Sequence, residues 1–216
     1  MKILAVDTAF GACSAALLQD DAVLARRFTV MERGHAEALA PMVEAVMFEA
    51  QIGFEALDRL AVTVGPGTFT GQRVGLAFMR GLRLALKKPL TGVTSLAAMT
   101  AQARAETGAE HAAAIHDARR GEVYLEIDSD GPHLIRFEDA PAALGGSNGR
   151  IALAGTAAHR LAEHLAAPNR QILVSPILAP DAEWVARLVA TLPPQSNAPR
   201  PLYLRAPDAK LPSPRS

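Results

Sequence analysis

Residues 64–81, VGPGTFTGQRVGLAFMRG, are the stretch that decides the fold of this chain. The run before it, 61–64, is rich in β-branched residues and is typical of a strand. The Gly-Pro-Gly sequence at 65–67 predicts a sharp turn, and a helix is expected to follow. Thr68 or Thr70 is suited to cap the start of that helix.

The glycines of this helix leave one of its faces almost bare, so a ligand or another backbone can approach it closely. A glycine turn before a helix start is a setting that binds phosphate. A P-loop, however, needs a lysine after Gly71, where Gln72 stands, and a dinucleotide fingerprint needs a glycine at Thr70. We therefore predict that Gly71 and Gly75 admit a helix of another protein rather than phosphates.

Hydrophobic patterns and turn residues predict further elements on both sides of this stretch. In the first half we expect strands at 3–6, 13–18, 23–30, 59–64 and 90–93, and helices at 34–51, 69–86 and 95–106. The second half repeats the pattern, with strands at 112–116, 122–127, 133–137, 151–154 and 172–174, and helices at 156–165 and 181–192. This order predicts an α/β fold of two lobes.

The expected lobes are residues 1–100 and residues 101–216, each a mixed sheet with flanking helices. The first three strands are joined by short turns, so we expect an antiparallel meander. The tail from residue 193 is rich in proline and is expected to be extended, with residues 201–205 able to pack back on the first lobe.

The composition excludes several classes of protein. Lys and Arg total 22 and Asp and Glu total 22, so the formal net charge is zero and strong unaided binding of nucleic acid is not expected. Cys13 is the only cysteine, which excludes an intrachain disulfide and a cysteine-rich zinc site. We find no signal-peptide pattern and no apolar run of about 18 residues, so we expect a cytoplasmic protein without a membrane segment.

Two turns carry residues suited to a cleft between the lobes. Asp7 and Thr8 follow the first strand of the first half, and Asp117 and Arg119 follow the first strand of the second half. In two-lobed folds of the actin type such turns hold phosphate or magnesium, and Asp is a suitable ligand for Mg²⁺. Asp and Thr also favour turns for purely local reasons. Both interpretations stay open, and weak binding of ATP or ADP with Mg²⁺ is the only cofactor considered.

Other candidate sites find no support in the sequence. His35 opens a predicted helix, but Leu39 occupies the position one turn later where a second histidine would complete a metal site. Ser14 and Ser95 lack the context of a hydrolase nucleophile. We therefore predict no metal site and no catalytic residue.

Several blocks along the chain resemble the TsaB/YeaZ family of tRNA threonylcarbamoyladenosine biosynthesis proteins. The resemblance rests on residues 3–8, 13–17, 65–75, 117–124 and 201–205, which occur in the family's order over nearly the whole chain. The glycine block is the most specific of them. Departures are small, with Ala9, Thr68 and Gln72 where Ser, Ser and Leu are commoner.

The resemblance implies a two-lobed actin-like ATPase (ASKHA, ribonuclease H-like) fold whose own nucleotide cleft is degenerate. It also implies a non-catalytic subunit that supports the catalytic protein TsaD together with the ATPase TsaE. That complex transfers a threonylcarbamoyl group to N6 of adenosine 37 in tRNAs that read ANN codons, so tRNA would be met only through the complex. The alternatives are a stand-alone nucleotide-dependent enzyme of the actin superfamily and a peptidase-like protein.

We expect the helices at 34–51 and 69–87 to form the surface that binds the partner, or a second copy of the chain when the partner is absent. Methionines suit a surface that accepts alternative partners. The residues expected at this interface are Leu39, Met42, Val43, Val46, Met47, Gly71, Val74, Gly75 and Phe78.

Overall fold

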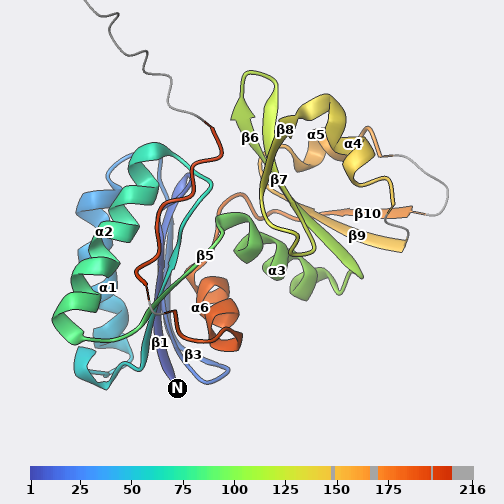
Figure 1. The fold of residues 1–216 in the computed structure, drawn as a ribbon. Helices are drawn as coiled ribbons and strands as arrows, with labels where there is room; N and C mark the ends of the chain where they lie inside the picture. The colour runs from blue at the N-terminus through green and yellow to red at the C-terminus, as the bar shows by residue number, and fades with distance from the viewer. Residues whose placement is uncertain (147–148, 166–169, 196, 206–216) are drawn as a thin grey trace, which may run out of the picture.

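The computed structural model describes residues 1–146, 149–165, 170–195 and 197–205, and it folds them into two lobes (Figure 1). Each lobe is built on a five-stranded mixed sheet. The strand order is β3-β2-β1-β4-β5 in the first sheet and β8-β7-β6-β9-β10 in the second. The two sheets share one topology, which confirms the repeat of elements and the two-sheet α/β fold expected from the sequence.

The first sheet contains a meander followed by two parallel strands. Its strands are β1 (Lys2–Asp7), β2 (Ala12–Gln19), β3 (Ala22–Val30), β4 (Arg59–Thr63) and β5 (Leu90–Val93). β2 pairs antiparallel with β1 and β3, as predicted, whereas β4 pairs parallel with β1 and β5. Since β1 and β4 are parallel neighbours, the turns after them lie at the same edge of the sheet.

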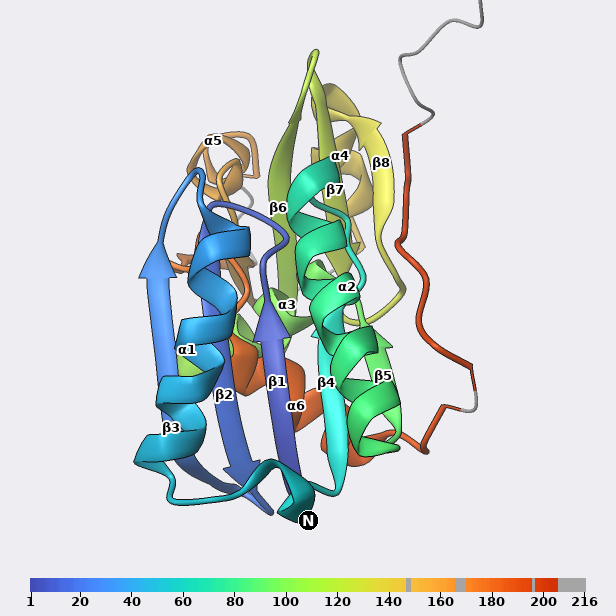
Figure 2. The ribbon, with the colours of Figure 1, turned by 90° about the vertical axis from the view of Figure 1, so that its left-hand side faces the viewer.

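Helices cover both faces of the first sheet (Figure 2). α1 (His35–Glu49) and α2 (Phe69–Leu86) lie on one face, and α6 (Ala182–Thr191) lies on the other. The side chains of β1 alternate between these two layers, because successive residues of a strand point to opposite faces. Leu4 packs under α1 and α2, and Ile3 packs under α6.

The second sheet is also covered on both faces. Its strands are β6 (His111–Arg119), β7 (Glu122–Ile127), β8 (His133–Arg136), β9 (Gly149–Ala154) and β10 (Arg170–Val174). α3 (Ser95–Thr107) packs against one face, and the short helices α4 (Ala140–Ala143) and α5 (Ala158–Ala162) pack against the other. Two single 3₁₀ turns, η1 (Phe54–Ala56) and η2 (Phe137–Asp139), complete the described elements. α3 also contacts α6, so it lies between the lobes (Figure 1).

Three helices are shorter than the sequence predicted, namely α1, α5 and, by one residue at each end, α6. α1 begins only at His35, because Gly34 has a φ of 87° and stands outside the helix. α5 ends at Ala162, because the amide groups of His164 and Leu165 bond to carbonyls three residues back and tighten the last turn.

The end of the chain returns to the first lobe. After α6, the backbone N–H of Leu202 donates a hydrogen bond to the carbonyl of Val64 at 2.8 Å, and Arg80 of α2 bonds to the carbonyl of Pro199. The predicted extended tail continues into residues 206–216, which lie outside the described residues. Among the described helices, none has the length and apolar character needed to cross a membrane.

Candidate functional site

The glycine block of α2 packs against the turn between β1 and β2. The hydroxyl of Thr8 donates to the carbonyl of Gly71 at 2.7 Å and accepts from the N–H of Gly75 at 3.0 Å. A Cβ on Gly71 would lie 2.1 Å from the carbonyl oxygen of Thr8, and a Cβ on Gly75 would lie 2.7 Å from the Thr8 hydroxyl. Both glycines are required so that the chain's own turn can approach the helix.

In the folded chain, the bare glycine face that was predicted to admit a partner's helix is filled by the chain's own turn after β1. Gly71 and Gly75 are buried, and their bare face meets Thr8 rather than another protein. Four other residues expected at the interface are also buried in the first lobe's core, where they pack with residues of β1, β4 and α2. These four residues are Leu39, Val43, Val46 and Met47. Met42, Val74 and Phe78 remain half-buried at the surface.

The surface that α1 and α2 present carries several exposed apolar side chains. A groove of about 520 Å³ runs between the helices and is lined by Phe69, Val74 and Phe78 among others. Phe69 is 56% exposed, and Leu84 at the far end of α2 is 79% exposed. Between them Gly81 faces open space, because a Cβ there would meet no atom within 4 Å. We call the surface formed by α1 and α2 around this groove the α1–α2 surface.

The tail completes one end of the α1–α2 surface. The guanidinium of Arg73 lies over the ring of Phe69, 3.3 Å from its centroid. The same side chain donates to the hydroxyl of Tyr203 at 2.9 Å, and the Tyr203 ring lies 5.8 Å from the Phe69 ring. Sequence reasoning missed Phe69, Gly81 and Leu84, although their helical spacing from Ala77 could have placed them on one outer face. The sequence predicted that residues 201–205 could pack back on the first lobe, and Tyr203 of this stretch contacts α2.

Asp7 is sealed inside the first lobe and does not reach the cleft. Its Oδ1 accepts hydrogen bonds from the Thr63 hydroxyl and from the N–H of Ala9 at 3.2 Å. Its Oδ2 is buried without a hydrogen-bond partner among the described residues. Burial raises the pKa of Asp7 to about 7, against its usual value of 3.8, because desolvation disfavours the charged carboxylate.

The predicted cleft residues are thus not brought together. Asp7 and Thr8 are buried beneath the start of α2, whereas Asp117 and Arg119 are exposed at the rim of the cleft. The carboxylate of Asp117 accepts the N–H of Arg119 at 2.8 Å, which is the local turn bond that the sequence left open as an alternative.

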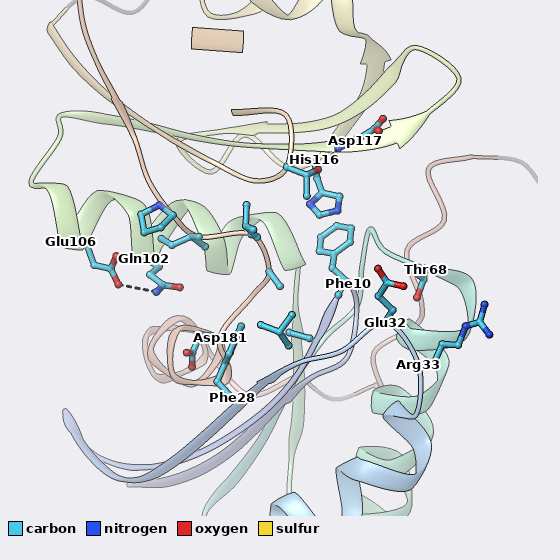
Figure 3. Close-up of a pocket in the computed structure, with 18 of the residues that line it drawn as sticks. Phe10, Phe28, Glu32, Arg33, Thr68, Gln102, Glu106, His116, Asp117 and Asp181 are labelled. Atoms are coloured by element: carbon cyan, nitrogen blue, oxygen red, sulfur yellow. Dashed lines mark hydrogen bonds between the residues drawn. The ribbon is translucent and has the colours of Figure 1, made fainter. Parts of the chain in front are cut away.

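A cleft lies between the two lobes, and two stacked aromatic side chains cross it (Figure 3). Its volume is about 970 Å³. Phe10, in the turn after β1, stacks on His116 of β6 with 3.7 Å between ring centroids. Burial lowers the pKa of His116 to about 4, so its imidazole is neutral at pH 7. The stack closes the space between the two turns that were expected to face each other.

The remaining polar candidates have structural roles. His35 Nε2 lies 3.1 Å from the carbonyl oxygen of Phe10, so this side chain ties α1 to the turn after β1. Ser14 accepts the N–H of Ala182 at 3.0 Å and holds the start of α6. Cys13 is buried, and burial raises the pKa of its thiol to about 11. In the part of the chain that the structure describes, three or more potential metal ligands nowhere cluster.

Comparison with known proteins shows close relatives. Residues 28–136 match the family model described as TsaD, tRNA N6-adenosine threonylcarbamoyltransferase. The TsaB protein of Escherichia coli, a tRNA threonylcarbamoyladenosine biosynthesis protein, is 40% identical over 67% of this chain and 62% of its own length. The matched region thus spans less than two thirds of that relative.

Two solved structures align with a larger share of this chain than the Escherichia coli relative does. A Pseudomonas aeruginosa protein with similarity to peptidase YeaZ superposes with a TM-score of 0.80 at 30% identity, over 94% of this chain and 99% of the other. YeaZ from Pseudomonas aeruginosa superposes with a TM-score of 0.73 at 32% identity, over 87% of this chain and 90% of the other. The chain belongs to the TsaB/YeaZ family and has its two-lobed actin-like ATPase fold.

Proposed function

We propose that this chain is a non-catalytic subunit of the complex that adds a threonylcarbamoyl group to N6 of adenosine 37 in tRNAs that read ANN codons. In this proposal the α1–α2 surface binds the catalytic subunit TsaD, and the ATPase TsaE acts on the same assembly. The observation that carries the proposal is the set of exposed apolar side chains on the α1–α2 surface, together with the burial of Asp7 away from the cleft.

The state of the cleft supports an accessory rather than a catalytic role. A magnesium nucleotide needs an accessible carboxylate, and Asp7 is fully buried beneath α2. Of the exposed carboxylates that line the cleft, Asp117 is held in a turn with Arg119, and the other two are Glu32 and Glu106. No second acidic side chain of the described cleft completes a metal site with Asp117.

The α1–α2 surface has the features of a docking site for a helix. Large apolar side chains stand at its two ends, with Phe69 at one and Leu84 at the other. Ala77 and Gly81 between them are small and exposed, so a partner helix can come close to the α2 backbone. Phe69, held between Arg73 and Tyr203, is a rigid aromatic anchor of the kind that carries binding energy at interfaces.

The same surface would pair two copies of this chain when TsaD is absent, because an apolar helix face is stabilised by any complementary apolar face. Binding of tRNA is assigned to the complex, since the chain has 22 basic and 22 acidic residues and carries no net charge.

A matched pair of substitutions tests the surface. Ala77→Glu places a charge in the centre of the α1–α2 surface, and Ala105→Glu places the same charge on the exposed side of α3. We expect Ala77→Glu to weaken co-purification with TsaD by about 100-fold or more and Ala105→Glu to leave it unchanged. Equal binding by both variants would show that the partner docks elsewhere.

Reconstituted tRNA modification tests the accessory role. We expect modification by TsaD and TsaE to depend on this chain, and we expect the chain alone to yield no product and to hydrolyse no ATP. Turnover of ATP by the isolated chain that disappears in Asp7→Asn would favour the stand-alone enzyme. Peptide cleavage by the isolated chain would favour the peptidase.

A further inference from the structure

The segment at residues 197–205 contacts both lobes. It passes along β5, the edge strand of the first sheet, and continues to the turn between β6 and β7 of the second sheet (Figure 1). Pro199 and Pro201 fix two φ angles of this segment, so it is a semi-rigid extended chain. We call residues 197–205 the strap.

The first lobe has a seat built for the strap. Pro199 lies against Gly92 of β5, where a Cβ would come within 2.7 Å of Pro199 Cβ and 2.4 Å of a methyl carbon of Val64. The backbone N–H of Leu202 donates to the carbonyl of Val64 at 2.8 Å, and Arg80 donates to the carbonyl of Pro199. These contacts attach two separate residues of the strap to the first lobe.

The second lobe holds the far end of the strap. The guanidinium of Arg205 pairs with the carboxylate of Glu122 at the start of β7, and it lies 3.5 Å from the carbonyl oxygen of Arg119. The two paired side chains are only 25% and 35% exposed, so water and salt screen them less than a free surface pair. From Leu202 to Arg205 the chain can span at most about 10 Å. The lobes therefore cannot separate on this side unless one of these contacts breaks.

Tyr203 lies between these two anchors and also touches α2. Its hydroxyl accepts a hydrogen bond from Arg73 at 2.9 Å, and its ring lies 5.8 Å from the ring of Phe69. Tyr203 is 44% exposed, beside the exposed ring of Phe69 on the α1–α2 surface. A molecule that covers Phe69 would therefore also meet the strap.

We propose that the strap holds the two lobes at a fixed spacing and that Tyr203 links this spacing to the α1–α2 surface. The stack of Phe10 on His116 joins the lobes inside the cleft, and the pair of Arg205 with Glu122 adds a second point that resists rotation about the first. The link is reciprocal, so any contact that fixes Tyr203 on α2 also favours this spacing of the lobes. The inference concerns the chain alone and does not rest on the partner role proposed above.

Distances between spin labels on the two lobes of the full chain test the strap. Cys13 is the only cysteine and is buried, so the labels attach to cysteines introduced by Glu44→Cys on α1 and Glu163→Cys after α5, both at exposed positions. We expect one narrow distribution of distances. Arg205→Glu sets two carboxylates against each other, and we expect it to raise the fraction of longer distances at least about threefold.

Matched variants separate the ion pair from a general change of charge. Arg200→Glu makes the same change at an exposed residue of the strap, and we expect it to leave the distances unchanged. Exchanging the pair, with Arg205→Glu and Glu122→Arg together, is expected to restore the narrow distribution. If Arg205→Glu does not fold, Leu202→Pro removes the N–H that bonds to Val64 and is expected to raise the fraction of longer distances as well.

A second pair of variants tests the link through Tyr203. Arg73→Ala frees Tyr203 from α2 without touching the second lobe, and we expect it to raise the fraction of longer distances. Leu84→Ala, at the far end of α2, is the control and is expected to leave the distances unchanged.

Four results would overturn the proposal. Unchanged distances in Arg205→Glu or, where that variant does not fold, in Leu202→Pro would show that the lobes keep their spacing without the strap. An equal change in Arg200→Glu, or failure of the exchanged pair to restore the narrow distribution, would refute the role of the ion pair. Unchanged distances in Arg73→Ala would refute the link to the α1–α2 surface.

Discussion

The hydroxyl of Thr8 donates a hydrogen bond of 2.7 Å to the carbonyl of Gly71, a residue 63 positions later in the chain. The same hydroxyl accepts the N–H of Gly75. In an α-helix the N–H of residue 75 would bond to the carbonyl of residue 71, so Thr8 bridges two groups that belong to the helix's own ladder. This contact joins α2 to the turn after β1 and seals Asp7 beneath it.

The contact predicts that alanine substitutions at two glycines of α2 change the stability of the protein in opposite directions. Gly71→Ala places a Cβ 2.1 Å from a backbone carbonyl oxygen, so we expect a loss of about 3 kcal/mol or more in the free energy of unfolding. Gly81→Ala meets open space and is expected to raise that free energy by about 0.5–1 kcal/mol. Urea denaturation measures both. A similar small effect at the two positions would contradict the packing of Thr8 on α2.

The hydroxyl of Thr8 is expected to matter more than its methyl group. Thr8→Val keeps the shape but removes the bridge between Gly71 and Gly75, and we expect it to cost about 1–3 kcal/mol in the free energy of unfolding. Thr8→Ser retains the hydroxyl and is expected to cost less than Thr8→Val. Equal stability of the valine variant and the wild type in chemical denaturation would count against the bridge.

Asp7 is expected to make the protein less stable as the pH rises. Burial raises the pKa of this carboxyl from 3.8 to about 7, so the folded protein holds the proton more tightly than the unfolded chain does. Its contribution to stability is complete below about pH 3.8 and is lost as the pH rises through about 7. Asp7→Asn removes this loss. We expect the free energy of unfolding of the variant, relative to that of the wild type, to rise by about 2–3 kcal/mol between pH 5 and pH 8. A pH-independent difference between the two would refute this account.

His116, in contrast to Asp7, is expected to make the protein less stable as the pH falls. Burial lowers the pKa of its imidazole from 6.5 to about 4, so the stability that its neutral ring contributes is lost as the pH falls from 6.5 toward 4. His116→Phe keeps a ring stacked on Phe10, and we expect it to lessen the loss of stability between pH 7 and pH 5 by about 2 kcal/mol. Denaturation curves at the two pH values check this. An unchanged pH dependence in the variant would show that the ring titrates freely in the folded protein.

Local patterns were enough to predict the elements and their order. Alternating and continuous apolar runs located β1 to β5, and the glycine turn at 65–67 with Thr68 as the cap placed the start of α2. The same elements recur after residue 111, so the second sheet could be expected from the first. These features depend on residues close together in the chain, and their energetics are largely local.

The candidate site could not be predicted in the same way, because its contacts join distant residues. The bare face of α2 could be recognised in the sequence, but whether it meets another protein or the chain's own Thr8 depends on where the turn after β1 lies. The stack of Phe10 on His116 likewise joins two lobes, and no local pattern encodes it.

The sequence by itself thus determined the family, the two-lobed α/β fold and the glycine helix, because short-range patterning and turn chemistry specify them. Only the tertiary structure decided what the glycines are for. Gly71 and Gly75 are buried against Thr8, and Gly81 is the exposed glycine of α2. The physical reason is steric, since a backbone carbonyl 2.1 Å from a would-be Cβ leaves room for glycine and for no other residue.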